Sequence, residues 1–66
     1  MTREELGNIL AEQRKAKGYS IRTLAEQCEM SKSTIVHIEQ GKFSPRIEIV
    51  DKICSVLDAE ITIKTR

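Results

Sequence analysis

The chain has 66 residues and a formal net charge of +1, from 11 basic and 10 acidic side chains. This length allows one domain, and with one Tyr and one Phe we expect an aliphatic core. No apolar run approaches the roughly 18 residues of a membrane helix, and no charged-then-apolar leader opens the sequence. We therefore expect a cytoplasmic protein, marginally stable unless it is well packed or oligomeric.

The first helix is predicted over residues 3–17. Thr2 and Glu5 have the spacing of a capping box, in which each side chain accepts a hydrogen bond from the other residue's amide. Gly18 supplies the stop. The apolar residues that fall near one face of this helix are Leu6, Ile9, Leu10 and Ala16.

Two short helices follow over residues 21–28 and 32–40, with Ser20 and Ser31 placed to cap their starts. Only two residues separate the first of these helices from the cap of the second, which is too few for a long loop. Two helices joined by such a turn form a helix-turn-helix, whose second helix can enter the major groove of DNA. Their inward faces are expected to hold Ile21, Leu24, Ala25, Cys28, Ile35 and Ile38, and Gly41 ends the second helix.

The fourth helix is predicted from Ser44 as cap and Pro45 as first residue to residue 57. Its apolar stripe is well over a hundred degrees wide, so one flank, at Ile49 and Val56, is left for a partner. The alternative is a fully inserted central helix, which a four-helix domain accommodates poorly.

The tail, residues 60–66, alternates apolar and polar residues in a β-branched segment typical of a strand, with Ile61 and Ile63 on one face. No second strand is predicted, so this one either frays or pairs with the same strand of another copy. With the apolar flank of the fourth helix, the tail predicts a homodimer.

The outward face of the residue 32–40 helix carries groups that can bind base edges. Lysine can donate to guanine O6 and N7, serine and histidine can bind several edges, and valine can pack on a thymine methyl. A lone histidine is more often an idle surface residue, and His37 has no partner at catalytic or metal spacing. We therefore predict no enzyme, and a DNA-reading face of Lys32, Ser33, Val36 and His37, with Gln40 beside it.

Basic residues stand at three predicted helix starts: Arg22, Lys32 and Arg46. Each opposes its helix dipole by roughly 0.3–1 kcal/mol, which is expected if side chains and free amides together bind phosphates. For any one of these residues, the alternative is an ordinary surface charge that binds nothing. Residues 31–46 also carry Lys42 but only one acid, Glu39, so the basic excess falls where a phosphate backbone would lie.

Cys28 and Cys54 match no disulfide or zinc spacing, and both fall on apolar faces of predicted helices. We interpret them as reduced core cysteines, with a redox sensor as the alternative. No metal site and no cofactor are predicted.

Positions 6 to 59 also hold caps, small residues and apolar residues in a fixed register: Leu6, Gly7, Arg14, Gly18, Ser20, Leu24, Ala25, Glu26, Ser31, Thr34, Ile35, Ile38, Glu39, Gly41, Pro45 and the stretch 53–57. With these residues the chain resembles the Cro/repressor (Xre) family of helix-turn-helix proteins. The resemblance implies that Arg14 and Glu39 form a buried ion pair, that Lys32, Ser33 and His37 read bases, and that Gln40 contacts a phosphate.

Three positions depart from that family. Ile21 replaces a Gln that touches the DNA backbone, so only its amide is left for a phosphate. Glu29 and Asp58 replace glycines in turns, where acidic side chains tolerate left-handed geometry less well, and we expect those turns to be altered. The strand-like tail replaces a fifth helix and is similar to the tails of HipB-type antitoxins.

The sequence thus predicts an all-α, compact four-helix helix-turn-helix domain over residues 1–59, with a short C-terminal β-strand over residues 60–66. We expect a homodimeric transcriptional regulator, a repressor, bound to an inverted-repeat site in double-stranded DNA. The alternative is an antitoxin-like subunit that neutralises a partner toxin. The predicted DNA-backbone contacts are Arg14, Ser20, Ile21, Arg22, Gln40, Lys42, Ser44 and Arg46, and the dimer contacts are Ile49, Val56, Ile61 and Ile63.

Overall fold

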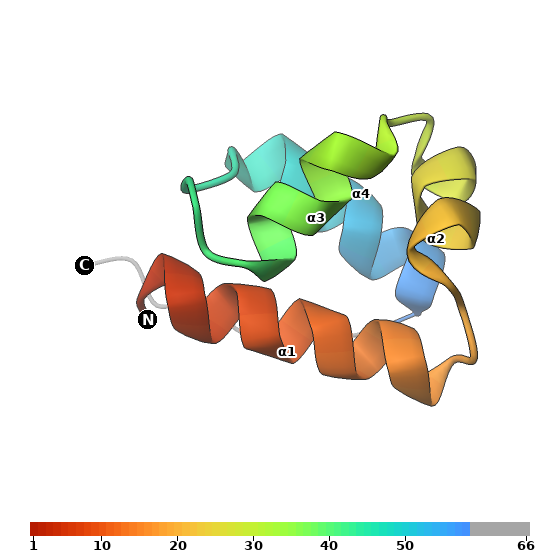
Figure 1. The fold of residues 1–66 in the computed structure, drawn as a ribbon, viewed down its shortest axis with the longest axis horizontal. Helices are drawn as coiled ribbons and strands as arrows, with labels where there is room; N and C mark the ends of the chain where they lie inside the picture. Colours follow the sequence, from red (N-terminus) through yellow and green to blue (C-terminus); the bar gives the residue numbers. More distant parts are fainter. Residues whose placement is uncertain (59–66) are drawn as a thin grey trace.

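Four helices make up the fold of the computed structural model, which describes residues 1–58 (Figure 1). The predicted all-α class and the order of its elements are confirmed. The predicted strand, with Ile61 and Ile63, lies outside the described residues. The helices are α1 (Arg3–Ala16), α2 (Ile21–Cys28), α3 (Lys32–Glu39) and α4 (Ile47–Leu57).

The first three helices begin where their caps were predicted. Around α1, the Thr2 amide donates to Glu5 Oε1 at 2.8 Å and the Glu5 amide donates to Thr2 Oγ1 at 3.0 Å. This hydrogen bond from the Thr2 amide holds the pKa of the Glu5 carboxyl below its ordinary value of 4.5. Ser20 and Ser31 cap α2 and α3 by accepting from the amide three residues on.

The start of α4 differs from the prediction. Arg46 occupies the N-cap in extended backbone (φ −66°, ψ 154°) without a side-chain cap, so Ser44 and Pro45 precede the helix. The Arg46 carbonyl is the acceptor for the amides of Ile49 and Val50, which places the first helical turn after Arg46. Extended backbone here carries the chain from the end of α3 into α4.

Both acidic residues at the glycine positions keep left-handed geometry, with φ 59° at Glu29 and φ 55° at Asp58. The expectation of altered turns was therefore wrong. At the first turn the Met30 amide donates to the Ala25 carbonyl at 2.9 Å, a bond that closes a helix C-terminus of this kind. The local strain, roughly 1–2 kcal/mol per residue, is tolerated because the surrounding packing fixes the turn.

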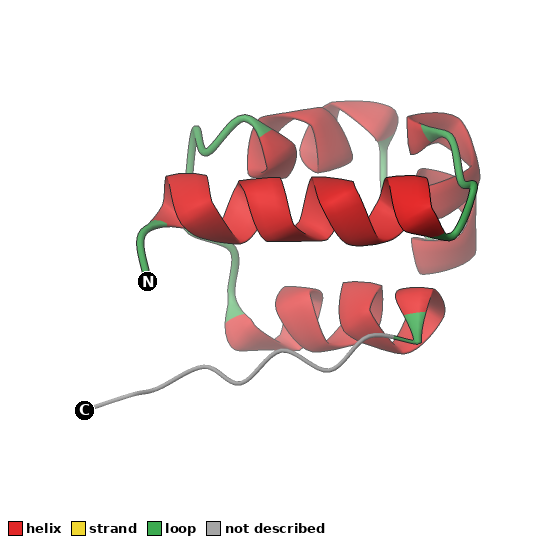
Figure 2. Cartoon of the chain, turned by 90° about the horizontal axis from the view of Figure 1, so that it is seen from below, coloured by secondary structure: helices red, strands yellow, loops and turns green. Residues whose placement is uncertain are grey.

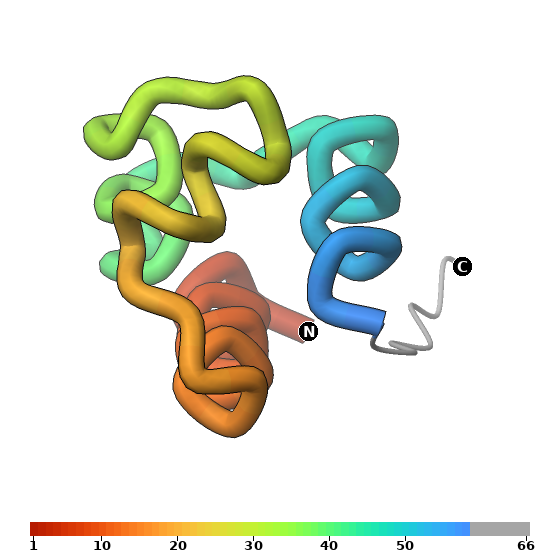
Figure 3. The backbone as a smooth tube through the Cα atoms, turned by 90° about the vertical axis from the view of Figure 1, so that its right-hand side faces the viewer, coloured from red at the N-terminus to blue at the C-terminus, as the bar shows by residue number. Residues whose placement is uncertain are grey.

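The core lies where all four helices meet. Figure 2 shows α1 and α4 running side by side, and Figure 3 shows α1 nearly end-on with α2 and α3 across the core from α4. The side chains of the central core cluster are aliphatic apart from Cys28, as the composition indicated. They are Leu10, Leu24, Ala25, Cys28, Ile35, Ile38, Ile53 and Leu57.

A close backbone contact fixes α1 against the end of α3. A Cβ placed on Gly7 would overlap the Ile38 carbonyl oxygen and lie 2.7 Å from that of Glu39. Only glycine allows the two helices to approach this closely. This contact, together with the core, sets the position of α3 relative to the rest of the protein.

Candidate nucleic-acid interface

One face of α3 is buried and the opposite face is open, as the apolar pattern predicted. Ile35 and Ile38 are each 1% exposed and belong to the core. The side chains on the other face are mostly polar and come from α3 and its C-cap residue Gln40. Lys32, Ser33, His37 and Gln40 are exposed, and Val36 is partly exposed.

The start of α3 is held by side-chain hydrogen bonds. Ser31 Oγ accepts from the Thr34 amide at 3.1 Å and lies 2.8 Å from Thr34 Oγ1. Lys32 follows at the first helical position, and the first turn contains no acidic residue. The free amides and the lysine therefore present uncompensated positive charge at this end of α3.

The predicted pair of Arg14 and Glu39 is formed, and it joins α1 to α3. Arg14 Nε and Nη2 donate to the two carboxylate oxygens of Glu39 at 2.7 and 3.1 Å. Its Nη1 donates to the Tyr19 carbonyl at 2.8 Å, which ties the same guanidinium to the turn before α2. Arg14 is 8% exposed.

The phosphate contact predicted for Arg14 is corrected by this geometry. Each of the three guanidinium nitrogens already has a protein acceptor, and the side chain is directed into the protein. Arg14 therefore joins α1 to α3 instead of facing a partner.

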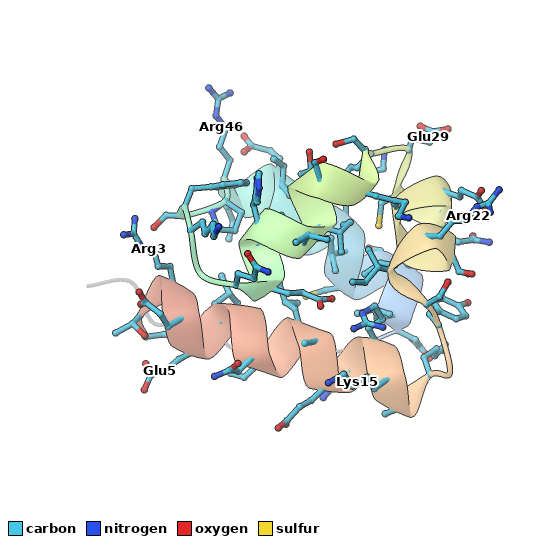
Figure 4. All side chains as sticks on the ribbon, in the orientation of Figure 1. Arg3, Glu5, Lys15, Arg22, Glu29 and Arg46 are labelled. Atoms are coloured by element: carbon cyan, nitrogen blue, oxygen red, sulfur yellow. The ribbon has the colours of Figure 1, made fainter. Side chains whose placement is uncertain are left out.

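A second cationic position lies at the start of α2. Ser20 is exposed and its hydroxyl is used for capping, whereas Ile21 packs against the core and is half-buried. Arg22 is exposed, as Figure 4 shows, but its Nε pairs with Glu26 Oε2 at 3.3 Å within the same helix. Since both side chains are mostly exposed, this pair is weak and Arg22 can exchange Glu26 for another anion.

A third segment with basic side chains runs from the end of α3 to the start of α4. Lys42, Ser44 and Arg46 are all exposed, and Arg46 projects away from the body of the protein in Figure 4. Because Arg46 is the N-cap and Glu48 occupies the first turn, the predicted cationic first turn of α4 is not formed. The Lys42 amide donates to the His37 carbonyl at 3.0 Å, which holds this segment to α3.

The apolar flank of α4 is only partly open. Ile49 and Val56, which were predicted to be uncovered, are half-buried and pack against the core. The most exposed apolar side chain of this helix is Ile47, at 60%, which the sequence pattern did not single out. Its position at the very start of the helix, outside the main stripe, explains why periodicity missed it.

Both cysteines are free thiols, with Cys28 buried in the core and Cys54 half-buried against it. Burial raises the pKa of Cys28, and burial together with neighbouring Asp51 raises the pKa of Cys54. Both shifts favour the protonated, unreactive form. Residues 1–58 contain no cluster of three or more His, Cys, Asp or Glu side chains suited to a metal ion.

None of the helices in residues 1–58 has the length and apolar composition that crossing a bilayer requires.

Solved structures share this arrangement. The clp gene regulator ClgR from C. glutamicum superposes with a TM-score of 0.88 at 31% identity, covering 92% of this chain and 78% of ClgR. SinR, described as the master regulator for biofilm formation and solved in complex with DNA, gives a TM-score of 0.79 at 36% identity, covering 83% of this chain and 89% of that chain.

Sequence comparison agrees with the structural one. SlrR, an HTH-type transcriptional regulator of Bacillus subtilis (strain 168), is 38% identical over 58 residues, which cover 86% of this chain and 38% of SlrR. SinR of the same strain is 35% identical over 57 residues, covering 85% of this chain and 51% of SinR. The chain thus spans about half or less of these relatives. Residues 10–63 match the helix-turn-helix family HTH_3, and the chain belongs to this Xre-type helix-turn-helix family.

Proposed function

We propose that this chain binds a specific site in double-stranded DNA through α3 and regulates transcription as a homodimeric repressor. The observation that carries the proposal is the two-sided character of α3: Ile35 and Ile38 are buried, while the polar side chains of the opposite face are exposed. A helix fixed on one side and open on the other is suited to insertion into the major groove. The structure of related SinR with DNA supports the choice of partner.

Base reading is assigned to the open face of α3. Lys32, in the first turn, can donate to guanine O6 and N7, and Ser33 and His37 lie farther along the same exposed face. Val36 is partly exposed and can contact a thymine methyl. The sequence preference of the protein would follow from these four residues.

Phosphate contacts are assigned to the exposed groups on either side of α3. On one side are Ser20, the Ile21 amide and Arg22 at the start of α2, where the first amides of the helix have no intrahelical acceptor. On the other side lie Gln40, Lys42, Ser44 and Arg46. These contacts fix the orientation of α3 on the duplex and contribute affinity at every sequence.

A homodimer would present two α3 helices to one duplex. Half-sites about 34 Å apart, one turn of DNA, are read by two-fold symmetric proteins, so the proposed site is an inverted repeat. The helical part of the proposed dimer surface is formed by Ile49 and Val56, which are half-buried on α4. Ile61 and Ile63 are proposed as its other part on the sequence pattern alone.

The proposal is tested by selecting binding sites from a randomised duplex pool and repeating the selection with two variants. Lys32→Ala should lose about 1–3 kcal/mol at one base position and relax the preference there. Lys42→Ala should weaken binding to all sequences alike. If both variants show the same uniform loss, the assignment of roles is wrong, and if no site is enriched, the DNA-binding proposal itself fails. The antitoxin-like subunit stays an untested alternative.

A further inference from the structure

We infer that Arg3, at the start of α1, is a further phosphate-binding residue and that neighbouring Glu4 opposes it. The inference rests on the proposed DNA binding and extends it to a helix that lies outside the helix-turn-helix. Its chemical basis is a basic side chain held beside the exposed segment of residues 42–46.

Two contacts place the first turn of α1 against that segment. A Cβ on Gly41 would lie 2.9 Å from the Glu4 Cα, so the two backbones touch at the beginning of the segment. Farther along, residues from both sides line one small hollow. They are Met1, Thr2, Arg3, Leu6, Ser44 and Pro45.

Arg3 is available to an external anion. Its side chain is 50% exposed, and its Nε lies 3.8 Å from Glu4 Oε2, whose own side chain is 64% exposed. An ion pair that is this long and this exposed contributes little and is readily exchanged. In Figure 4, Arg3 and Arg46 both project from the end of the molecule where α1 begins and the chain enters α4.

The backbone that carries Arg3 is ordered by the capping box. The reciprocal hydrogen bonds between Thr2 and Glu5 fix the residues on both sides of Arg3 and Glu4. The Glu5 carboxylate is occupied by the Thr2 amide and points away from Arg46 in Figure 4. Glu4 is therefore the acid that reduces the positive potential at Arg3.

Duplex DNA carries one phosphate per about 3.4 Å of axis along each strand, so a strand held by Lys42 and Arg46 offers a further phosphate to a cation beside them. One contact contributes about −0.9 to the slope of log K against log salt. Extrapolated from about 1 M to 0.15 M salt, that slope corresponds to about a fivefold change in affinity per protomer.

The test uses the full chain and a selected duplex, with affinity measured by fluorescence anisotropy over a range of salt concentrations. Arg3→Ala should weaken binding about fivefold per protomer at 0.15 M salt and make the slope shallower by about 0.9 per protomer. Arg3→Lys, which keeps the charge, should restore most of the affinity. Glu4→Gln should tighten binding, a gain that a purely structural role of this turn does not predict.

Lys15→Ala is the matched control, because it removes the same charge from α1 at a side chain that points away from α3 in Figure 4. Lys15→Ala should change the affinity for the selected duplex by less than about twofold, since Lys15 makes no proposed phosphate contact. If Arg3→Ala behaves like Lys15→Ala while Lys42→Ala weakens binding, the inference about Arg3 is wrong and the proposed function stands. If the wild-type chain itself shows no salt-dependent binding, the proposed function fails first.

Discussion

Replacing Arg14 by methionine removes a guanidinium that makes three hydrogen bonds in an almost closed environment. The side chains of Arg14 and Glu39 are each 10% exposed, so the remaining Glu39 carboxylate would be buried without a cation. Breaking a buried pair in this way costs about 3–5 kcal/mol. Glu39→Gln is milder, about 1.5–3 kcal/mol, because its amide oxygen can still accept one bond and Arg14 keeps the Tyr19 carbonyl.

The double variant should lose no more than Arg14→Met alone, because the buried carboxylate that Arg14→Met leaves without a cation is then gone as well. The coupling between the two sites should therefore be about 2 kcal/mol or more. Urea unfolding followed by circular dichroism gives the free energy of unfolding of each variant. For so small a domain we expect this free energy to fall by about 1 kcal/mol per M urea. Since the total stability is only about 3–10 kcal/mol, the series is best run with trimethylamine N-oxide present in every sample.

The matched control is Arg22 and Glu26, an Arg–Glu pair on the surface of one helix. Its side chains are 76% and 68% exposed, and it should contribute no more than about 0.5 kcal/mol. Additive losses at Arg14 and Glu39, or losses as small as those of the control pair, would refute the argument that the buried pair holds α1 to α3.

Three further outcomes follow from the packing and the backbone. Gly7→Ala should destabilise the domain by about 1–3 kcal/mol, although alanine favours helix. The control Asn8→Ala, at an exposed position of the same helix, should be neutral or stabilising, and urea melts of the two variants compare their free energies of unfolding. Asp58→Gly should stabilise by about 0.5–1 kcal/mol by relieving left-handed strain, and an unchanged melting midpoint would count against that strain. In thiol labelling of the native protein at pH 8, half-buried Cys54 should react before Cys28, which should react only as the chain unfolds. Equal labelling rates for the two thiols would contradict the deeper burial of Cys28.

Local signals predicted much of this fold. Ser20 and Ser31 can satisfy helix amides only at the first turn, so each marks a helix start within a residue. The alternation of buried and exposed positions on α3 could likewise be read from the 3.6-residue period, because Ile35 and Ile38 have no apolar competitor on the opposite face other than Val36.

What the sequence could not give depends on contacts between distant segments. The need for glycine at position 7 arises from the end of α3, which lies more than 30 positions away in the chain. Arg14 could be predicted to pair with Glu39 or to contact phosphate, and only the bond to the Tyr19 carbonyl shows that each of its three guanidinium nitrogens has an acceptor within the protein. The start of α4 was misplaced because Ser44 and Pro45 suit a helix start locally, whereas the path from α3 keeps Arg46 extended.

The central claim, that α3 and the basic residues around it bind a specific duplex, is tested most directly by a salt titration of binding to a selected site and to a scrambled one. A dimer that neutralises about six phosphates should give a slope of log K on log salt near −5 for the selected site. The scrambled duplex should bind more weakly at every salt concentration. A flat slope for both duplexes, or equal affinity for the two, would contradict the account.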